Sequence, residues 1–296
     1  KVLRKKNFII VVGRGKKTSD SFEKETGHKV ISGGLNNFLA TSPTLPKYVI
    51  IAVDILLLTE ISKTLIKYGV KKILCEKPGA IFLKDLKYID RLSKKNLCKF
   101  YIAYNRRFYE NINQAKKYIK KDGGIKNLHF EFNEKIAKIS SAEYPKIVKN
   151  RWFLANSSHL IDIVLFLIGE IKTLKTLTHG KNLWHPSANF FIGFGVTKKN
   201  KFFTYSSNWN EDGRWKLFFE TKNYQFQFES LEKLLIQNKN NLKKKYNKII
   251  YEKNNFKPGF KQMLESFDKN DFNNFCSLDQ QIKNHNIYCK IANYKK

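Results

Sequence analysis

The chain has 296 residues, of which 42% are hydrophobic and 27% charged, an ordinary balance for a globular protein with a large core. Its formal net charge is +31, but 49 of its 56 basic residues are Lys, scattered along the chain, whereas proteins that read nucleic acids concentrate Arg in patches. We therefore do not expect a nucleic-acid partner. No apolar run approaches the roughly 20 residues that cross a bilayer, so we do not expect a membrane span either.

The first hundred residues alternate short apolar runs with helical segments. We expect strands at 8–12, 28–32, 48–53, 71–75 and 99–104, and helices at about 19–26, 33–39, 57–68 and 83–95. Ser19 or Asp20 is the expected N-cap of the first helix, while Gly27 and Gly69 are expected to end the first and third. Strands alternating with helices in this way predict right-handed βαβ units, hence a doubly wound, Rossmann-like parallel sheet.

After Tyr104 the pattern changes. We expect helices at 105–121, 152–169, 260–267 and 279–294, and strands at 127–133, 172–178, 188–196, 201–207, 215–221 and 224–229. Residues 238–257 are rich in Lys and Asn and are expected to form a loop with a short strand at 248–251. The α/β class therefore divides into residues 1–104 and an α+β domain, 105–296, with an open antiparallel or mixed sheet.

The apolar run ending at Cys75 breaks off at Glu76-Lys77-Pro78-Gly79, where Pro and Gly stop the strand. Ligands of open parallel sheets bind beyond the carboxyl ends of the strands. A lysine held there can donate a proton to a substrate oxygen, and burial lowers its pKa toward neutrality. The alternative is an ordinary Glu-Lys surface pair before a turn.

Three motifs in order give this chain a family resemblance. They are the Glu76-Lys77-Pro78 loop, the link Ala103-Tyr104-Asn105-Arg106-Arg107-Phe108, and the segment Asn156-Ser157-Ser158-His159-Leu160-Ile161-Asp162. Together with the two-domain pattern they resemble the Gfo/Idh/MocA oxidoreductases. The resemblance implies an NAD(P)-dependent oxidoreductase acting on a sugar or nucleotide-sugar hydroxyl or keto group. Trp184-His185-Pro186-Ser187, Gly213-Arg214-Trp215 and Lys257-Pro258-Gly259-Phe260 further resemble a branch associated with surface-polysaccharide sugar metabolism.

The chain departs from that family in two places. The family begins with a strand and a G-x-G-x-x-G/A loop, but here Gly13-Arg14-Gly15 is followed by Lys and no third Gly falls at Thr18. Counting strands back from Glu76 makes 8–12 the second strand of the fold. We therefore expect residues 1–6 to be the tail of the lost first helix and the chain to be truncated upstream. Many family dehydrogenases also carry Asp four residues before the His, where this chain has Ala155, and Asn156 is only a partial substitute.

On this alignment the loop at 13–20 meets the adenosine ribose. Arg14 there, with Thr18 and Ser19 beside it and no carboxylate before Asp20, predicts NADP over NAD. Lys-rich composition in a solvated turn is the alternative. The resemblance further places Val53, Glu76 and Lys77 beside the cofactor.

The resemblance implies that Lys77 orients or protonates the substrate oxygen and that His159 is the base. Asp162 follows His159 by three residues, so both fall on one helix face, where Asp162 would orient the imidazole. A helix-entry His with an Asp that merely caps or pairs is the alternative.

Expected substrate contacts are Arg106, Arg151, Trp152, Asn156 and His185, because Arg is rare in this chain and Trp stacks on sugar faces. Surface ion pairs for the arginines and core packing for the aromatic residues are the alternatives.

Four widely spaced Cys without zinc-ligand spacing predict free thiols, a cytoplasmic location and no metal site. The resemblance also implies a homo-oligomer through the exposed face of the second domain's sheet. The competing interpretation is a catalytically silent relative, a sugar-binding or scaffold protein that lacks the cofactor loop.

Overall fold

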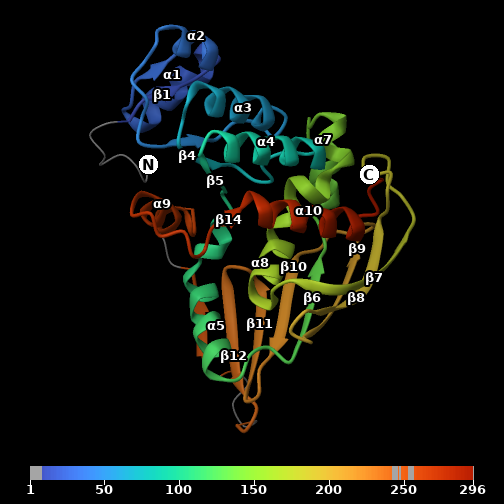
Figure 1. Ribbon diagram of the computed structural model, residues 1–296. Coiled ribbons are helices and arrows are strands. Elements are labelled where there is room, and N and C mark those ends of the chain that lie inside the picture. Colours follow the sequence, from blue (N-terminus) through green and yellow to red (C-terminus); the bar gives the residue numbers. More distant parts are fainter. Residues whose placement is uncertain (1–8, 242–245, 247, 253–256, 296) are drawn as a thin grey trace.

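The computed structural model describes residues 9–241, 246, 248–252 and 257–295. Figure 1 shows helix-covered small sheets above one large sheet, with helices between them. The expected helix tail at 1–6 and the first residue of the strand at 8–12 lie outside the described residues.

The elements of the first half follow the expected alternation. They are β1 (Val11–Val12), α1 (Lys16–Thr26), β2 (Val30–Ile31), α2 (Gly34–Ala40), β3 (Val49–Ile51), α3 (Leu58–Tyr68), β4 (Lys72–Cys75), α4 (Leu83–Lys95) and β5 (Lys99–Ile102). β3, β4 and β5 pair in parallel, and β1 pairs in parallel with β2. The parallel Rossmann-like arrangement is confirmed. Among the described residues no strand joins β1 to β3, so these pairs form two separate sheets.

Glycine ends two of these helices as expected. Gly27 and Gly69 take φ of 76° and 110°, the left-handed conformation that a C-cap requires and that glycine adopts without strain. The expected N-cap of α1 was wrong. The helix begins at Lys16 after Gly15, and the Ser19 hydroxyl lies inside the first turn, donating to Gly15 O at 2.9 Å.

The second half contains a 3-10 helix η1 (Asn105–Phe108), a π-helical turn η2 (Phe153–Ser157), and α5 (Glu110–Lys121), α6 (Ile136–Ser141), α7 (Lys146–Asn150), α8 (Ser158–Ile168), α9 (Phe260–Asp268) and α10 (Leu278–Ile291). Its strands are β6 (Asn127–Phe132), β7 (Ile171–His179), β8 (Phe190–Thr197), β9 (Phe202–Asn208), β10 (Trp215–Glu220), β11 (Tyr224–Ser230), β12 (Lys233–Asn238), β13 (Lys248–Tyr251) and β14 (Cys276–Ser277).

Eight of these strands form one sheet in the order β13-β12-β11-β10-β6-β9-β8-β7. Every neighbouring pair is antiparallel except β6 and β9, which confirms the mixed sheet. One face is a tightly packed aromatic core that includes Phe130, Phe219 and Phe226. α5 and α8 lie over the sheet in Figure 1, and α8 is buried at ten of its eleven positions.

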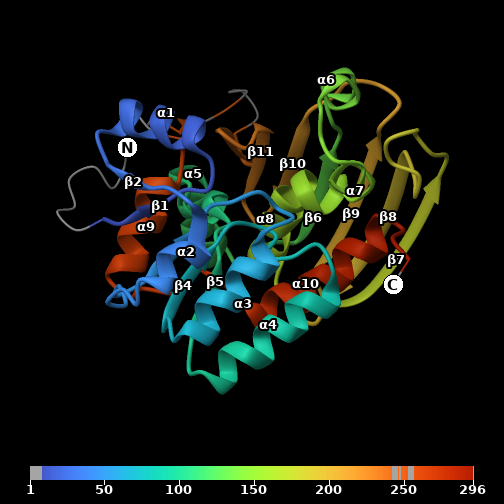
Figure 2. The same ribbon diagram turned by 90° about the horizontal axis from the view of Figure 1, so that it is seen from above.

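The chain returns to its first half at the end. β14 adds antiparallel to β5, and α10 packs against both α4 and α8, between the two layers. Figure 2 shows α10 running beside α4. The C-terminal helix therefore contacts both halves of the protein where they meet.

Several boundaries differ from expectation. The helix expected at 105–121 is interrupted at Tyr109, whose ψ of 139° is extended, and the helix expected at 152–169 begins with the π-helical turn. α6, α7, β12 and β14 were not anticipated, since the first two are short and polar and β14 has only two residues.

Candidate active site

The loop after β4 holds Lys77 in one place. Gly79 N–H donates to Glu76 O at 3.0 Å, and the Lys77–Pro78 peptide bond is cis. Gly79 has φ of 80°, and a Cβ there would lie 2.5 Å from Ile102 Cδ1. Glycine therefore avoids both the backbone strain of this conformation and a clash with the Ile102 side chain.

Helix α10 fastens the same loop from the other side. Gln281 Nε2 donates to Pro78 O at 2.9 Å, and a ring N–H of His285 donates through Nε2 to Ile81 O at 2.9 Å. Both side chains are buried, so their hydrogen bonds are shielded from water. The C-terminal helix thus positions the loop that carries Lys77.

The Lys77 amine points at the first turn of the helical segment that carries His159. It donates a hydrogen bond to Ala155 O, one turn before His159. Burial disfavours the ammonium form, and the nearby cations Arg106 and Lys257 repel it, which together lower the pKa of Lys77 to about 8. Lys77 can therefore exchange a proton near neutral pH, as expected from its place at the strand end.

His159 lies beside Lys77 in a buried environment. Among the described residues its Nδ1 has no hydrogen-bond partner, and its ring meets Tyr104 edge-on with centroids 5.8 Å apart. Burial, with the positive charges of Arg106 and Lys77, holds the pKa of His159 well below its ordinary value. The imidazole is consequently neutral at pH 7, and its Nδ1 is a buried polar atom without a partner among the described residues.

Asp162 does not orient His159. Its two carboxylate oxygens accept from Arg107, Nε at 2.8 Å and Nη2 at 2.6 Å. Arg107 also donates to Gln280 Oε1 at 3.1 Å, which ties η1, α8 and α10 together. Both charges are buried, so the structure gives Asp162 a bracing partner in place of the expected contact with the imidazole.

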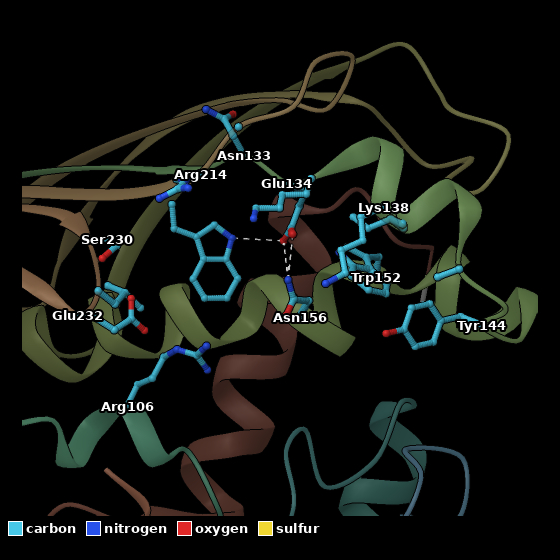
Figure 3. A pocket seen from close by; sticks show the side chains of 16 residues that line it. Arg106, Asn133, Glu134, Lys138, Tyr144, Trp152, Asn156, Arg214, Ser230 and Glu232 are labelled. Carbon is cyan, nitrogen blue, oxygen red and sulfur yellow. Dashed lines mark hydrogen bonds between the residues drawn. The ribbon is translucent and has the colours of Figure 1, made fainter. Parts of the chain in front are cut away.

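A pocket of about 500 Å³ opens between the large sheet and the segments that follow β6 (Figure 3). Lys77 and His159 do not line it, but the His159 ring lies 6.4 Å from the ring of Trp215, which does. Its lining is polar and aromatic: Arg106, Asn133, Glu134, Lys135, Lys138, Ile139, Ala142, Tyr144, Trp152, Asn156, Gly213, Arg214, Trp215, Ser230, Leu231 and Glu232. Arg106 connects the pocket to the buried pair, because its charge acts on both Lys77 and His159.

Glu134 organises the deep side of this pocket and was missed in the sequence. Its carboxylate accepts from Asn156 Nδ2 at 2.9 and 3.1 Å, Ser157 Oγ at 2.6 Å and Trp215 Nε1 at 3.3 Å (Figure 3). The side chain is 5% exposed, and burial raises its pKa. One signal was present: Glu134 is the second residue after the end of β6, as Lys77 is after the end of β4.

Three of the five expected substrate residues, Arg106, Trp152 and Asn156, line the pocket. Arg151 does not line it, and its guanidinium stacks 4.5 Å from the ring of Tyr294.

His185 is not a substrate contact. It is 0% exposed, and both ring nitrogens are used: Nδ1–H donates to Ala188 O at 2.6 Å, and Nε2 accepts from the Tyr294 hydroxyl at 2.8 Å. Tyr294 in turn accepts from Phe153 N–H at 3.1 Å. Burial lowers the pKa of His185 to about 4, so it is a neutral core histidine that braces η2.

The expected cofactor residues follow the carboxyl ends of strands. Arg14 is exposed after β1, and Val53 is exposed after β3, while Glu76 is half-buried after β4. The hydroxyls of Thr18 and Ser19 both donate to Gly15 O at 2.9 Å, at the start of α1.

The residues expected to bind the cofactor are suited to only part of a dinucleotide. The Arg14 guanidinium is exposed and has no ion pair among the described residues, so it would be available to a ribose phosphate. On the family resemblance, Glu76 and Lys77 would border the nicotinamide. The glycine loop that cradles a pyrophosphate is not found in residues 9–241, because Gly13 and Gly15 lack the third glycine.

Within the described parts of the chain no helix is long and apolar enough to cross a membrane. A cluster of three or more His, Cys, Asp or Glu side chains able to hold a metal ion is likewise not found there.

Neither a protein-family model nor a curated protein matches the sequence. Solved structures do match over almost its whole length. An oxidoreductase from Thermotoga maritima has a TM-score of 0.76 at 15% identity, covering 96% of this chain and 87% of its own. Levoglucosan dehydrogenase in complex with NADH and levoglucosan has a TM-score of 0.74 at 15% identity, with the same coverages.

A super-repressor mutant of Gal80p from Saccharomyces cerevisiae matches equally well, with a TM-score of 0.78 at 12% identity, covering 97% of this chain and 88% of its own. The identities are low, so these likenesses concern the fold. They confirm the predicted fold class: the chain shares its Rossmann-like parallel strands and its large mixed sheet with these solved structures.

Proposed function

We propose that this protein is an NAD(P)-dependent oxidoreductase that acts on a hydroxyl or keto group of a sugar or nucleotide-sugar. The observation that carries the proposal is the Lys77–His159 pair. Two basic groups with lowered pKa values lie together at the carboxyl end of a parallel sheet, beside a pocket with polar and aromatic walls. The solved dehydrogenase with NADH and levoglucosan supports a sugar as substrate.

Oxidation of a carbinol requires a base for the hydroxyl proton while the hydride leaves the carbon. A bound nicotinamide supplies the hydride acceptor. We assign the proton transfer to Lys77, because its pKa of about 8 lies near the operating pH. His159 has a pKa well below its ordinary value, so its role is that of a neutral imidazole that orients the same oxygen. Sequence reasoning had made His159 the base.

The cofactor proposal favours NADP over NAD. Arg14 and the neighbouring Lys16 and Lys17 are exposed at the start of α1, whose first turn contains no acidic side chain. A guanidinium and two ammonium groups favour a 2′-phosphate over a free ribose hydroxyl.

A homo-oligomer is proposed through the open face of the large sheet. Leu177 and Ile192 are directly paired across β7 and β8, and Phe190, Phe194 and Phe202 continue the same apolar surface. Leu177 is 68% and Phe194 56% exposed, a concentration that favours burial against a second copy. A cytoplasmic role in surface-polysaccharide sugar metabolism completes the proposal, supported by the sequence resemblance.

A silent sugar-binding or scaffold protein is the second candidate. It is favoured by the structural likeness to a super-repressor mutant of Gal80p.

The two functions are separated by one variant and one titration. NADPH and NADH binding to the gene product is measured by fluorescence, followed by turnover of a panel of sugars and nucleotide-sugars. Lys77→Ala is expected to lower kcat by about 10² or more with nucleotide binding retained. Lys87→Ala, an exposed lysine of α4, is the matched control and should leave kcat unchanged. Near-normal turnover by Lys77→Ala removes the catalytic assignment, and absence of nucleotide binding favours the silent relative.

A further inference from the structure

The charges lining the pocket are unequal. Four cationic side chains, Arg106, Lys135, Lys138 and Arg214, face two carboxylates, those of Glu134 and Glu232. Both carboxylates accept hydrogen bonds from protein donors, Glu134 from the three side chains described above and Glu232 from the Tyr109 hydroxyl at 3.2 Å. Among the described residues, none of the four cations has an ion-pair partner within 4 Å. The pocket therefore keeps a positive potential.

This excess is not simply a result of the Lys-rich composition, because two of the seven arginines of the chain line this one pocket. Arg107, which follows Arg106 in the sequence, shows the alternative, because Asp162 compensates its charge. Among the described residues neither Arg106, which is half-buried, nor Arg214, which is exposed, has such a partner. Guanidinium groups bind carboxylates and phosphates through paired N–H donors, so two unpaired guanidinium groups indicate an oxyanion.

Arg106 is also held in place. Its guanidinium carbon lies 5.2 Å from the centre of the Trp215 ring, within the range of a cation–π contact. Its Nε is a buried donor with no partner among the described residues, and burying an unsatisfied donor is unfavourable. An oxyanion in the pocket would satisfy it.

The other side chains that line the pocket are suited to a sugar ring. Trp215, Trp152 and Tyr144 contribute aromatic surface, on which the C–H face of a pyranose ring packs. The amide of Asn156 is pinned to Glu134, so the polar side of the pocket is arranged before a ligand arrives.

Resting on the proposed function, we infer that the substrate is an anionic sugar, carrying a carboxylate or a phosphate that Arg106 and Arg214 bind, with its ring between the aromatic walls. The two arginines reach the pocket from separate elements, Arg106 from η1 and Arg214 from the turn before β10 (Figure 3). Since Arg106 also acts on Lys77 and His159, the bound anion lies close to the reacting groups.

Direct binding to the gene product tests this without requiring turnover. The fluorescence of the pocket tryptophans is titrated with D-glucuronate, D-glucose 6-phosphate and neutral D-glucose at low salt. At least one ionised probe should bind about tenfold or more tightly than glucose. Arg106→Gln and Arg214→Gln should each weaken that probe about tenfold to a hundredfold, the effect of losing a charge-assisted hydrogen bond, and leave glucose unchanged. Arg91→Gln, an exposed arginine of α4, is the control.

The two ionised probes identify the source of the charge: tighter glucuronate indicates a carboxylate and tighter glucose 6-phosphate indicates a phosphate. The inference is overturned if neither ionised probe binds at millimolar concentration, if both bind no better than glucose, or if the pocket variants behave like Arg91→Gln. NADPH-linked turnover of neutral sugars alone would overturn it and leave the oxidoreductase proposal standing. Tight, Arg-dependent binding of an ionised probe without nucleotide binding would support the anionic ligand and overturn the oxidoreductase proposal.

Discussion

Replacing Asp162 with Asn separates a bracing role from a chemical one. In the folded protein Asp162 and Arg107 form a two-pronged ion pair with side chains 0% and 1% exposed. The Asn variant keeps the shape and removes the charge, which leaves the Arg107 guanidinium buried without compensation.

The expected destabilisation follows from that burial. Breaking a buried ion pair by removing one partner typically lowers the free energy of unfolding by about 3–5 kcal/mol. With a urea dependence of about 3 kcal/mol per molar, the unfolding midpoint should fall by about 1–1.7 M. Replacing both partners with apolar residues, Arg107→Met with Asp162→Leu, should recover much of the loss because no charge is left unpaired.

Urea unfolding followed by circular dichroism measures this, with Glu170→Gln as the control. Glu170 pairs with Lys198 and Lys283 at the surface, where solvent screens the charges, so its midpoint should barely move. The reasoning is refuted if Asp162→Asn unfolds at the wild-type midpoint and yet loses turnover, since Asp162 would then act on the chemistry as the sequence had suggested.

Three further predictions rest on the proposed function. In the oxidative direction kcat/KM should rise with pH through about 8, as the Lys77 amine loses its proton, and Lys77→Met should abolish that limb; an unchanged profile in Lys77→Met would assign the limb to another group. Arg14→Ala should shift the ratio of NADP to NAD affinity toward NAD, as measured by nucleotide titration, and an unaltered ratio would contradict the 2′-phosphate argument. Phe194→Lys, on the exposed sheet face, should yield monomers by light scattering if that face joins two copies, with Lys87→Ala retaining the wild-type mass; a wild-type chain that is already monomeric removes the interface.

The architecture was accessible from the sequence because its signals are local. Apolar runs mark β3 to β5, and Gly27 and Gly69 mark helix ends at positions where only glycine adopts the required backbone at no steric penalty. The strand end at Lys77 likewise follows from Pro and Gly stopping the ladder. Signals of this kind need no knowledge of what packs against them.

The site depends on contacts between distant segments, and there the sequence misled. Asp162 stands three residues from His159, yet its partner Arg107 is 55 residues away. His185 has the chemistry of a ligand but lies in the core, where Tyr294 and Ala188 take both nitrogens. Glu134 could not be predicted, because its role depends on contacts with η2 and β10, which lie far from it in the sequence.

The hydrogen bonds from Gln281 to Pro78 and from His285 to Ile81 have a consequence for synthesis on the ribosome. They join residues 203 and 204 positions apart, so the loop bearing Lys77 emerges long before the helix that fastens it. At about 5–20 residues per second that interval is about 10–40 s. Nascent chains, and chains clipped before α10, would carry every residue of the reactive pair without the support that fixes its geometry. On the proposed function, catalytic competence therefore requires that α10 has been made, well after the residues to which the chemistry is assigned.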